Sequence, residues 1–118
     1  MVKIIKNEDL PILELEIGDE LKEEDYNIIR PALEEKIDKH GEVNCLVRMK
    51  EFPDFTTGAF LEDLRLALEN YTDMNKIAIV GDDEKLENLS KAAVIFPGVK
   101  VENFRTKDLD AAWGWLKA

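Results

Sequence analysis

Hydrophobic residues recur along this chain with two different spacings, and the spacing changes several times from one end to the other. Between Ile12 and Ile17 apolar and acidic residues alternate, which is typical of a strand with Glu14 and Glu16 on a face in water. From about Glu24 the apolar residues lie three or four positions apart, which places them on one face of a helix. This helix is expected to stop at Gly41, because glycine readily adopts the left-handed conformation of a helix end.

The same two patterns predict nine elements in the order β-β-α-β-α-β-α-β-α. Strands are expected at residues 2–6, 12–17, 44–49, 77–80 and 99–104, and helical stripes at residues 26–37, 60–71, 86–96 and 109–116. The third helix is expected to run unbroken from Asp83 to about Phe96. Three successive strand–helix–strand units favour parallel pairing, and the short connection between the first two strands favours an antiparallel hairpin. The predicted fold is a single α/β domain over residues 1–118, with a mixed, mostly parallel five-stranded sheet and four helices.

Composition narrows the classes of function. The chain has 26 acidic and 16 basic residues, so its formal charge is −10. A nucleic-acid binder needs a basic surface and an anionic membrane attracts cations, so neither is expected as a partner. No apolar run reaches the roughly 18 residues of a membrane helix. The one cysteine, Cys45, cannot form an intramolecular disulfide, which favours a reducing cytoplasm as the location of this acidic protein.

Several short segments follow one another in a recognisable order: Ile17-Gly18, Glu24-Asp25-Tyr26, Pro31, Gly41, Phe60 to Leu64, Lys76 to Gly81, Phe104, and Ala112 to Leu116. In this order and spacing, which cover nearly the whole chain, the sequence resembles the SpoIIAA-like family. That family is a branch of the STAS-like (anti-sigma factor antagonist) and SEC14-like fold group. The resemblance implies a STAS-like fold and a small regulatory module that binds other proteins, although a shared fold does not carry a shared activity.

The resemblance also implies a candidate modification site. STAS proteins of the anti-anti-sigma type carry a serine in an Asp-Ser-Ser-Gly turn, and a partner kinase phosphorylates that serine. At the comparable place this sequence has Asp54-Phe55-Thr56-Thr57-Gly58, which keeps an acid, two hydroxyls and a glycine but inserts Phe55. Thr56 and Thr57 are therefore candidate phosphoacceptors at a helix N-terminus, where backbone N–H groups stabilise phosphate. The alternative is that these threonines simply cap the helix.

Aromatic residues suggest a contact surface. Phe52, Phe55 and Phe60 lie within and after one nearly uncharged segment, where they could line a pocket or form a docking patch, or fold inward over the sheet. Trp113 and Trp115 are two positions apart on a helix, so they cannot share a face. Trp113 falls on the apolar stripe and is expected in the core, which leaves Trp115 as a candidate surface residue.

Two adjacent acids, Asp82 and Asp83, follow a presumed parallel strand, at the edge of the sheet where α/β proteins bind ligands. They are weak candidates for holding Mg²⁺, and helix capping explains both more simply. No hydroxyl, histidine and acid stand in a recognisable catalytic order, and there is no phosphate-binding glycine motif. We therefore expect neither an enzyme nor a cofactor.

Two functions remain open. The first is a non-catalytic regulatory module that binds a protein partner and is switched at Thr56 or Thr57. The second is a carrier or sensor of a small apolar, lipid-like ligand, as in the SEC14-like relatives. A homodimer is also expected, because the edge strand Val2–Lys6 and Trp115 both offer a surface for a second copy.

Overall fold

Five strands form one sheet in the computed structural model, which describes residues 1–7, 9–50, 56–68, 73–89 and 92–118. The strands lie in space in the order of the sequence: β1 (Val2–Ile5), β2 (Ile12–Ile17), β3 (Val43–Met49), β4 (Met74–Val80) and β5 (Lys100–Phe104). β1 pairs antiparallel with β2, and every later pair is parallel. The prediction of a mixed, mostly parallel five-stranded sheet is confirmed.

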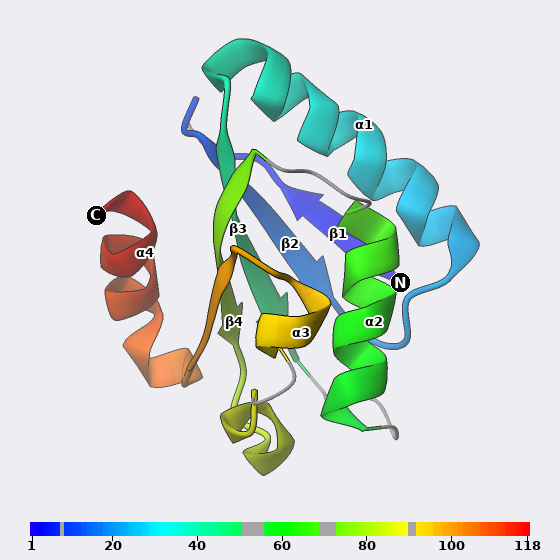
Figure 1. The fold of residues 1–118 in the computed structure, drawn as a ribbon, viewed down its shortest axis with the longest axis vertical. Coiled ribbons are helices and arrows are strands. Elements are labelled where there is room, and N and C mark those ends of the chain that lie inside the picture. Colours follow the sequence, from blue (N-terminus) through cyan, green and yellow to red (C-terminus); the bar gives the residue numbers. More distant parts are fainter. Residues whose placement is uncertain (8, 51–55, 69–72, 90–91) are drawn as a thin grey trace.

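The helices lie on both faces of this sheet (Figure 1). In the described residues they are α1 (Glu23–His40), α2 (Thr57–Leu68), α3 (Ala92–Ile95) and α4 (Leu109–Lys117), with the 3-10 turns η1 (Glu84–Glu87) and η2 (Thr106–Asp108). Each crossover between parallel strands moves one place further along the sheet, and connections of one hand that move in one direction return over the same face. α1, α2 and α3 therefore share a face, while α4 follows the last strand and covers the opposite face.

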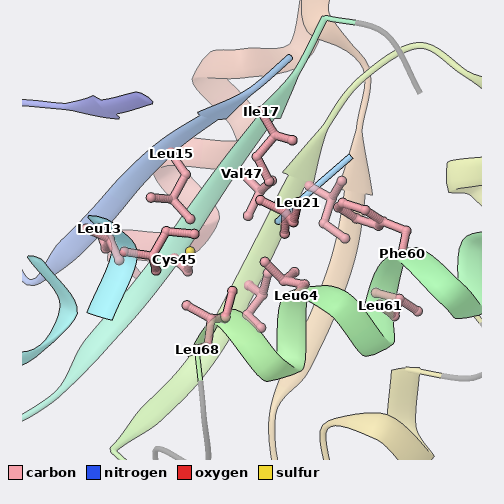
Figure 2. Close-up of a cluster of buried hydrophobic side chains, with 14 of the residues drawn as sticks. Leu13, Leu15, Ile17, Leu21, Cys45, Val47, Phe60, Leu61, Leu64 and Leu68 are labelled. Atoms are coloured by element: carbon pink, nitrogen blue, oxygen red, sulfur yellow. The ribbon is translucent and has the colours of Figure 1, made fainter. Parts of the chain in front are cut away.

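Two hydrophobic clusters hold these layers together. Beneath α2, the side chains of Phe60, Leu61, Leu64 and Leu68 pack toward the strands, and each is no more than 2% exposed (Figure 2). Burying a side chain of this size stabilises the fold by roughly 1.5–3 kcal/mol. The smaller cluster beneath α4 consists of Ile12, Leu46, Ala78, Val80, Ala112 and Leu116. β3 and β4 contribute to both clusters, which explains why apolar residues occur on both faces of these strands.

A buried carboxylate joins the first strand to the first helix. Asp25 is 3% exposed, and its Oδ2 accepts a hydrogen bond from the Lys22 N–H at 2.9 Å, which closes the first turn of α1. Its Oδ1 accepts a second hydrogen bond, from the Val2 N–H at 3.1 Å. α1 then runs through to Gly41, whose φ of 79° confirms the predicted left-handed stop.

The prediction of one helix from Asp83 to about Phe96 is wrong. The chain instead forms η1, leaves it at Asn88, and forms the four-residue α3. Aspartate and asparagine favour caps and turns over helix interiors, so Asp83 and Asn88 limit this turn to four residues. Because the helix is interrupted, its buried face also changes. Ala92 is buried, whereas Ala93, which lies within the predicted stripe at residues 86–96, is exposed.

The prediction that Glu14 faces water is also wrong. Its side chain lies on the α4 face of the sheet and is 7% exposed, with Oε2 3.2 Å from Arg48 Nη1. Alternation placed Glu14 on the correct face of β2, opposite Leu13 and Leu15. What alternation could not show is that Arg48, one strand away, supplies the charge that allows this carboxylate to be buried.

Gly81 and Gly114 provide a matched test of the packing at the end of β4. A Cβ at Gly81 would lie 2.7 Å from Leu86 Cδ1, and Leu86 is 0% exposed, whereas a Cβ at Gly114 meets no atom within 4 Å. We expect Gly81→Ala to lower the free energy of unfolding by roughly 1–3 kcal/mol. Gly114→Ala should raise it by roughly 0.5–1 kcal/mol, because alanine favours a helix interior. Urea denaturation measures both, and equal midpoints for the two variants would contradict the packing described.

Candidate functional site

The segment predicted as a functional surface begins at the carboxyl end of β3 and ends at the start of α2. Phe52 and Phe55 lie outside the described residues, so their place in a contact surface stays a prediction. The strands β2, β3, β4 and β5 are parallel, so their carboxyl ends lie together at one side of the sheet, here called the carboxyl edge. Thr56, Thr57, Asp82 and Asp83 follow these strand ends and lie along that edge.

Thr56 caps α2. Its Oγ1 accepts a hydrogen bond from the Ala59 N–H at 3.1 Å, and its carbonyl accepts the Phe60 N–H at 3.0 Å. The contact explains why the helix begins here, since an N-cap oxygen satisfies one of the N–H groups that a first turn leaves unpaired. The Thr56 side chain is nevertheless exposed.

Thr57 makes a different contact. Its hydroxyl donates a hydrogen bond of 2.6 Å to the Lys85 carbonyl, which ties the first turn of α2 to η1. Thr57 is half-buried, so the two adjacent threonines differ in accessibility. A modifying enzyme can approach the Thr56 hydroxyl directly, whereas modification of Thr57 would first require the contact with η1 to break.

Acidic residues gather beside the first turns of α2. Burial raises the pKa of the Asp63 carboxyl, and the neighbouring carboxylates of Glu20 and Glu62 raise it further. Burial, together with the charge of Asp63, likewise raises the pKa of Tyr26 on α1. Asp63 is therefore a half-buried acid beside two other carboxylates, while Arg65 lies 3.8 Å from Glu62 and Arg30 donates to the Leu66 carbonyl at 2.7 Å.

Phe60 and Trp115, the described residues of the predicted aromatic surface, lie on opposite faces of the sheet. Phe60 is 1% exposed and belongs to the core beneath α2, so its assignment to a contact surface is wrong. Trp115 lies on the opposite face of the sheet, with its ring centre 5.7 Å from that of Phe104 and Lys76 Nζ 5.4 Å from its own centre. Trp113 is half-buried rather than part of the closed core, and Lys117 Nζ lies 5.5 Å from its ring centre.

Asp82 and Asp83 make separate capping contacts. Asp82 Oδ1 accepts a hydrogen bond from the Thr106 N–H at 2.8 Å, and the Thr106 N–H and hydroxyl hold the pKa of this carboxyl below its ordinary value. Asp83 Oδ1 accepts the Lys85 N–H at 2.9 Å, which starts η1. Within the described ranges, no three His, Cys, Asp or Glu side chains gather in a way that could hold a metal ion. Asp83 thus caps the turn that follows it, as the capping interpretation predicts, whereas Asp82 holds the start of η2 before α4.

Sequence reasoning missed the acidic group around Asp63. Glu20, Tyr26 and Asp63 come from a loop and two helices, and their sequence spacing carries no common pattern. One available signal was Asp63 itself, an acid one position from Leu64 on the buried side of α2.

None of the helices in the described part of the chain has the length and apolar character needed to cross a bilayer.

Comparison with known proteins agrees with this architecture. A family model described as SpoIIAA-like matches residues 12–117. A solved structure, that of an uncharacterized protein from Shewanella loihica PV-4 with a SpoIIAA-like fold, is 24% identical with a TM-score of 0.62. The alignment covers 98% of this chain and 92% of that one, and at this identity it supports the fold alone. No curated protein matches the chain.

The capping contact of Thr56 can be tested by substitution. We expect Thr56→Ala to lower the free energy of unfolding by roughly 0.5–2 kcal/mol, because the Ala59 N–H loses its acceptor. Thr56→Ser keeps an oxygen at that place and should match the parent within about 0.5 kcal/mol. Thermal and urea denaturation provide the measurement, and a Thr56→Ala variant as stable as Thr56→Ser would show that the contact does not stabilise α2.

Proposed function

Because the chain belongs to the SpoIIAA-like family, we propose that it is a non-catalytic regulatory module that binds another protein through α2. The observation that carries this proposal is the outer face of α2. It begins at the exposed cap Thr56 and continues through Glu62 and Arg65 to Leu66, whose side chain is 51% exposed. On this proposal the partner buries the Leu66 side chain, and its charged neighbours form the polar rim of the contact.

The charge of this surface indicates the kind of partner. Glu20, Glu62 and Asp63 lie together, so that Asp63 is less acidic than an isolated aspartate. A cationic patch on the partner would relieve this repulsion and speed association. The proposed partner is therefore a protein with a basic docking surface.

The core beneath α2 supports docking over the alternative of a carrier for an apolar ligand. A carrier of the SEC14-like kind needs apolar space beneath this helix. Among the described residues, Phe60, Leu61, Leu64 and Leu68 instead pack against strand residues that are themselves at most 1% exposed, including Leu13 and Val47 (Figure 2).

The proposal of a non-catalytic role rests on the use of the polar groups at the carboxyl edge of the sheet. Asp82, Asp83 and Thr56 each accept a backbone N–H, so one oxygen of each side chain is engaged in a cap. We also place the protein in a reducing, cytoplasmic compartment. Cys45 is a buried free cysteine, and burial raises the pKa of its thiol to about 12, which suits a packing residue and not a reactive one.

Docking through α2 predicts a matched pair of variants. Leu66→Asp should lose the partner that the parent protein captures from cells of its native host, with affinity weakened about tenfold or more. Val94→Asp introduces the same change at an apolar side chain that is 82% exposed on α3, and should keep that partner. Quantitative affinity capture followed by titration of the recovered partner gives the measurement.

Two outcomes would contradict docking through α2. One is equal loss of the partner in both variants, which would point to a general effect of the added charge. The other is a co-purifying apolar ligand in native mass spectrometry of freshly prepared protein, which would favour the carrier instead.

The switch is proposed at Thr56 in preference to Thr57, since Thr56 is exposed and Thr57 is held by η1. We expect protein from the native host to carry a phosphate on Thr56 in some growth states, measured by intact mass and peptide mapping. Phosphate would add negative charge beside Glu62 and Asp63. The dissociation constant for the basic partner should therefore change about tenfold or more. Unmodified protein in every growth state would remove the switch and leave docking intact.

A further inference from the structure

The two edge strands of the sheet differ in what lies against their outer backbone groups. At the β1 edge the Val2 N–H is bonded to Asp25 Oδ1, and α1 lies beside the strand. β5, coloured orange in Figure 1, is the last strand of the sheet, and no described strand pairs with its outer side. An open strand of this kind is a template for another strand.

The direction of the backbone groups of β5 follows from one hydrogen bond. The Phe104 carbonyl accepts the Gly81 N–H at 3.0 Å, so Phe104 turns its backbone groups toward β4. In a parallel ladder successive residues alternate, so Glu102 and Lys100 also face β4, while Val101 and Asn103 direct their N–H and carbonyl groups outward.

We propose that β5 pairs antiparallel with β5 of a second copy, with Val101 at the two-fold axis. In this register Lys100 lies opposite the partner's Glu102, and Glu102 lies opposite the partner's Lys100. All four side chains belong to the α4 face, since they share the parity of Phe104, and both residues are exposed in the single chain. The sequence Lys-Val-Glu is thus complementary to itself when reversed, which is what an isologous interface requires.

The hydrogen bonds of this register can be counted from the chain. Val101 and the partner's Val101 exchange two backbone hydrogen bonds. Asn103 N–H donates to the carbonyl of the partner's Val99, and the symmetric bond adds a fourth. The Val99 N–H makes no bond across the interface, because it already donates to the Phe96 carbonyl at 3.1 Å. Lys100 and Glu102 form the closer, non-hydrogen-bonded pairs between these bonds, where opposite charges interact best.

The charge of the whole chain favours this edge over other surfaces. Residues 98–107 carry three cations, Lys100, Arg105 and Lys107, and one anion, Glu102, so their net charge is +2. The remaining residues then carry −10 − 2 = −12. Two copies that meet at β5 keep their acidic surfaces apart. The Trp115–Phe104 pair beneath α4 adds apolar surface at this strand.

Reversal of charge tests this register specifically. The parent protein should show a monomer–dimer equilibrium between 13.5 kDa and twice that mass in analytical ultracentrifugation. Lys100→Glu places acids opposite one another at two symmetric positions. We therefore expect the dissociation constant of the dimer to rise about tenfold or more. Glu102→Lys should have the same effect. The double variant Lys100→Glu/Glu102→Lys restores both pairs and should return the parent affinity. Lys6→Glu makes the same change of charge beside β1, at the opposite edge of the sheet, and this control should leave association near the parent value.

A backbone variant provides an independent test. Val101→Pro removes the outward N–H and none of the groups that face β4, so the sheet should remain intact while the dimer is lost. Circular dichroism and the urea midpoint check the fold of each variant. The proposal is overturned if the parent remains a 13.5 kDa species at the highest concentration reached. It is also overturned if a dimer persists in Lys100→Glu and Glu102→Lys, or if the double reversal fails to restore what the single reversals lose.

Discussion

The constraint on which this structure depends is that adjacent parallel strands are joined by crossovers of one hand. Strand order in space equals strand order along the chain from β1 to β5, so each crossover repeats the direction of the one before it. This places α1, α2 and α3 on one face of the sheet and leaves the other face to the helix after the last strand. Apolar side chains on both faces of β3 and β4 are then buried, so apolar residues predominate in these strands.

The same constraint brings the polar residues that follow the strands to the carboxyl edge of the sheet, where most of them cap helices and turns. Thr56 caps α2, Asp83 starts η1, and Asp82 holds the first turn before α4. Because these oxygens accept backbone N–H groups, the edge acts as a set of starts for helices and turns. The half-buried Asp63, whose pKa is raised by burial and by neighbouring carboxylates, supports our proposal that the outer face of α2 binds a basic partner.

The edges of the sheet follow from chain order as well. β1 is held by α1 through the buried Asp25, which accepts both the Val2 and the Lys22 N–H. β5 has helices on both faces but no strand on its outer side among the described residues. The asymmetry arises because α1 returns across the first two strands, whereas α4 ends the described chain beneath β3 and β4 without reaching past β5.

The local pattern of the sequence determined the strand Ile12–Ile17, the end of α1 at Gly41, the mixed sheet and the resemblance to the SpoIIAA-like family. These features depend on the period of apolar residues and on backbone preferences, which each residue carries with it. Contacts between distant residues decided the rest. Arg48 pairs with Glu14 and so allows that carboxylate to be buried, and Phe60 packs in the core beneath α2. Asn88 ends a turn where the apolar spacing indicated a helix, and the acids around Asp63 meet only after α1 and α2 pack. A one-dimensional pattern shows which face a side chain occupies, and only tertiary structure decides what lies against that face.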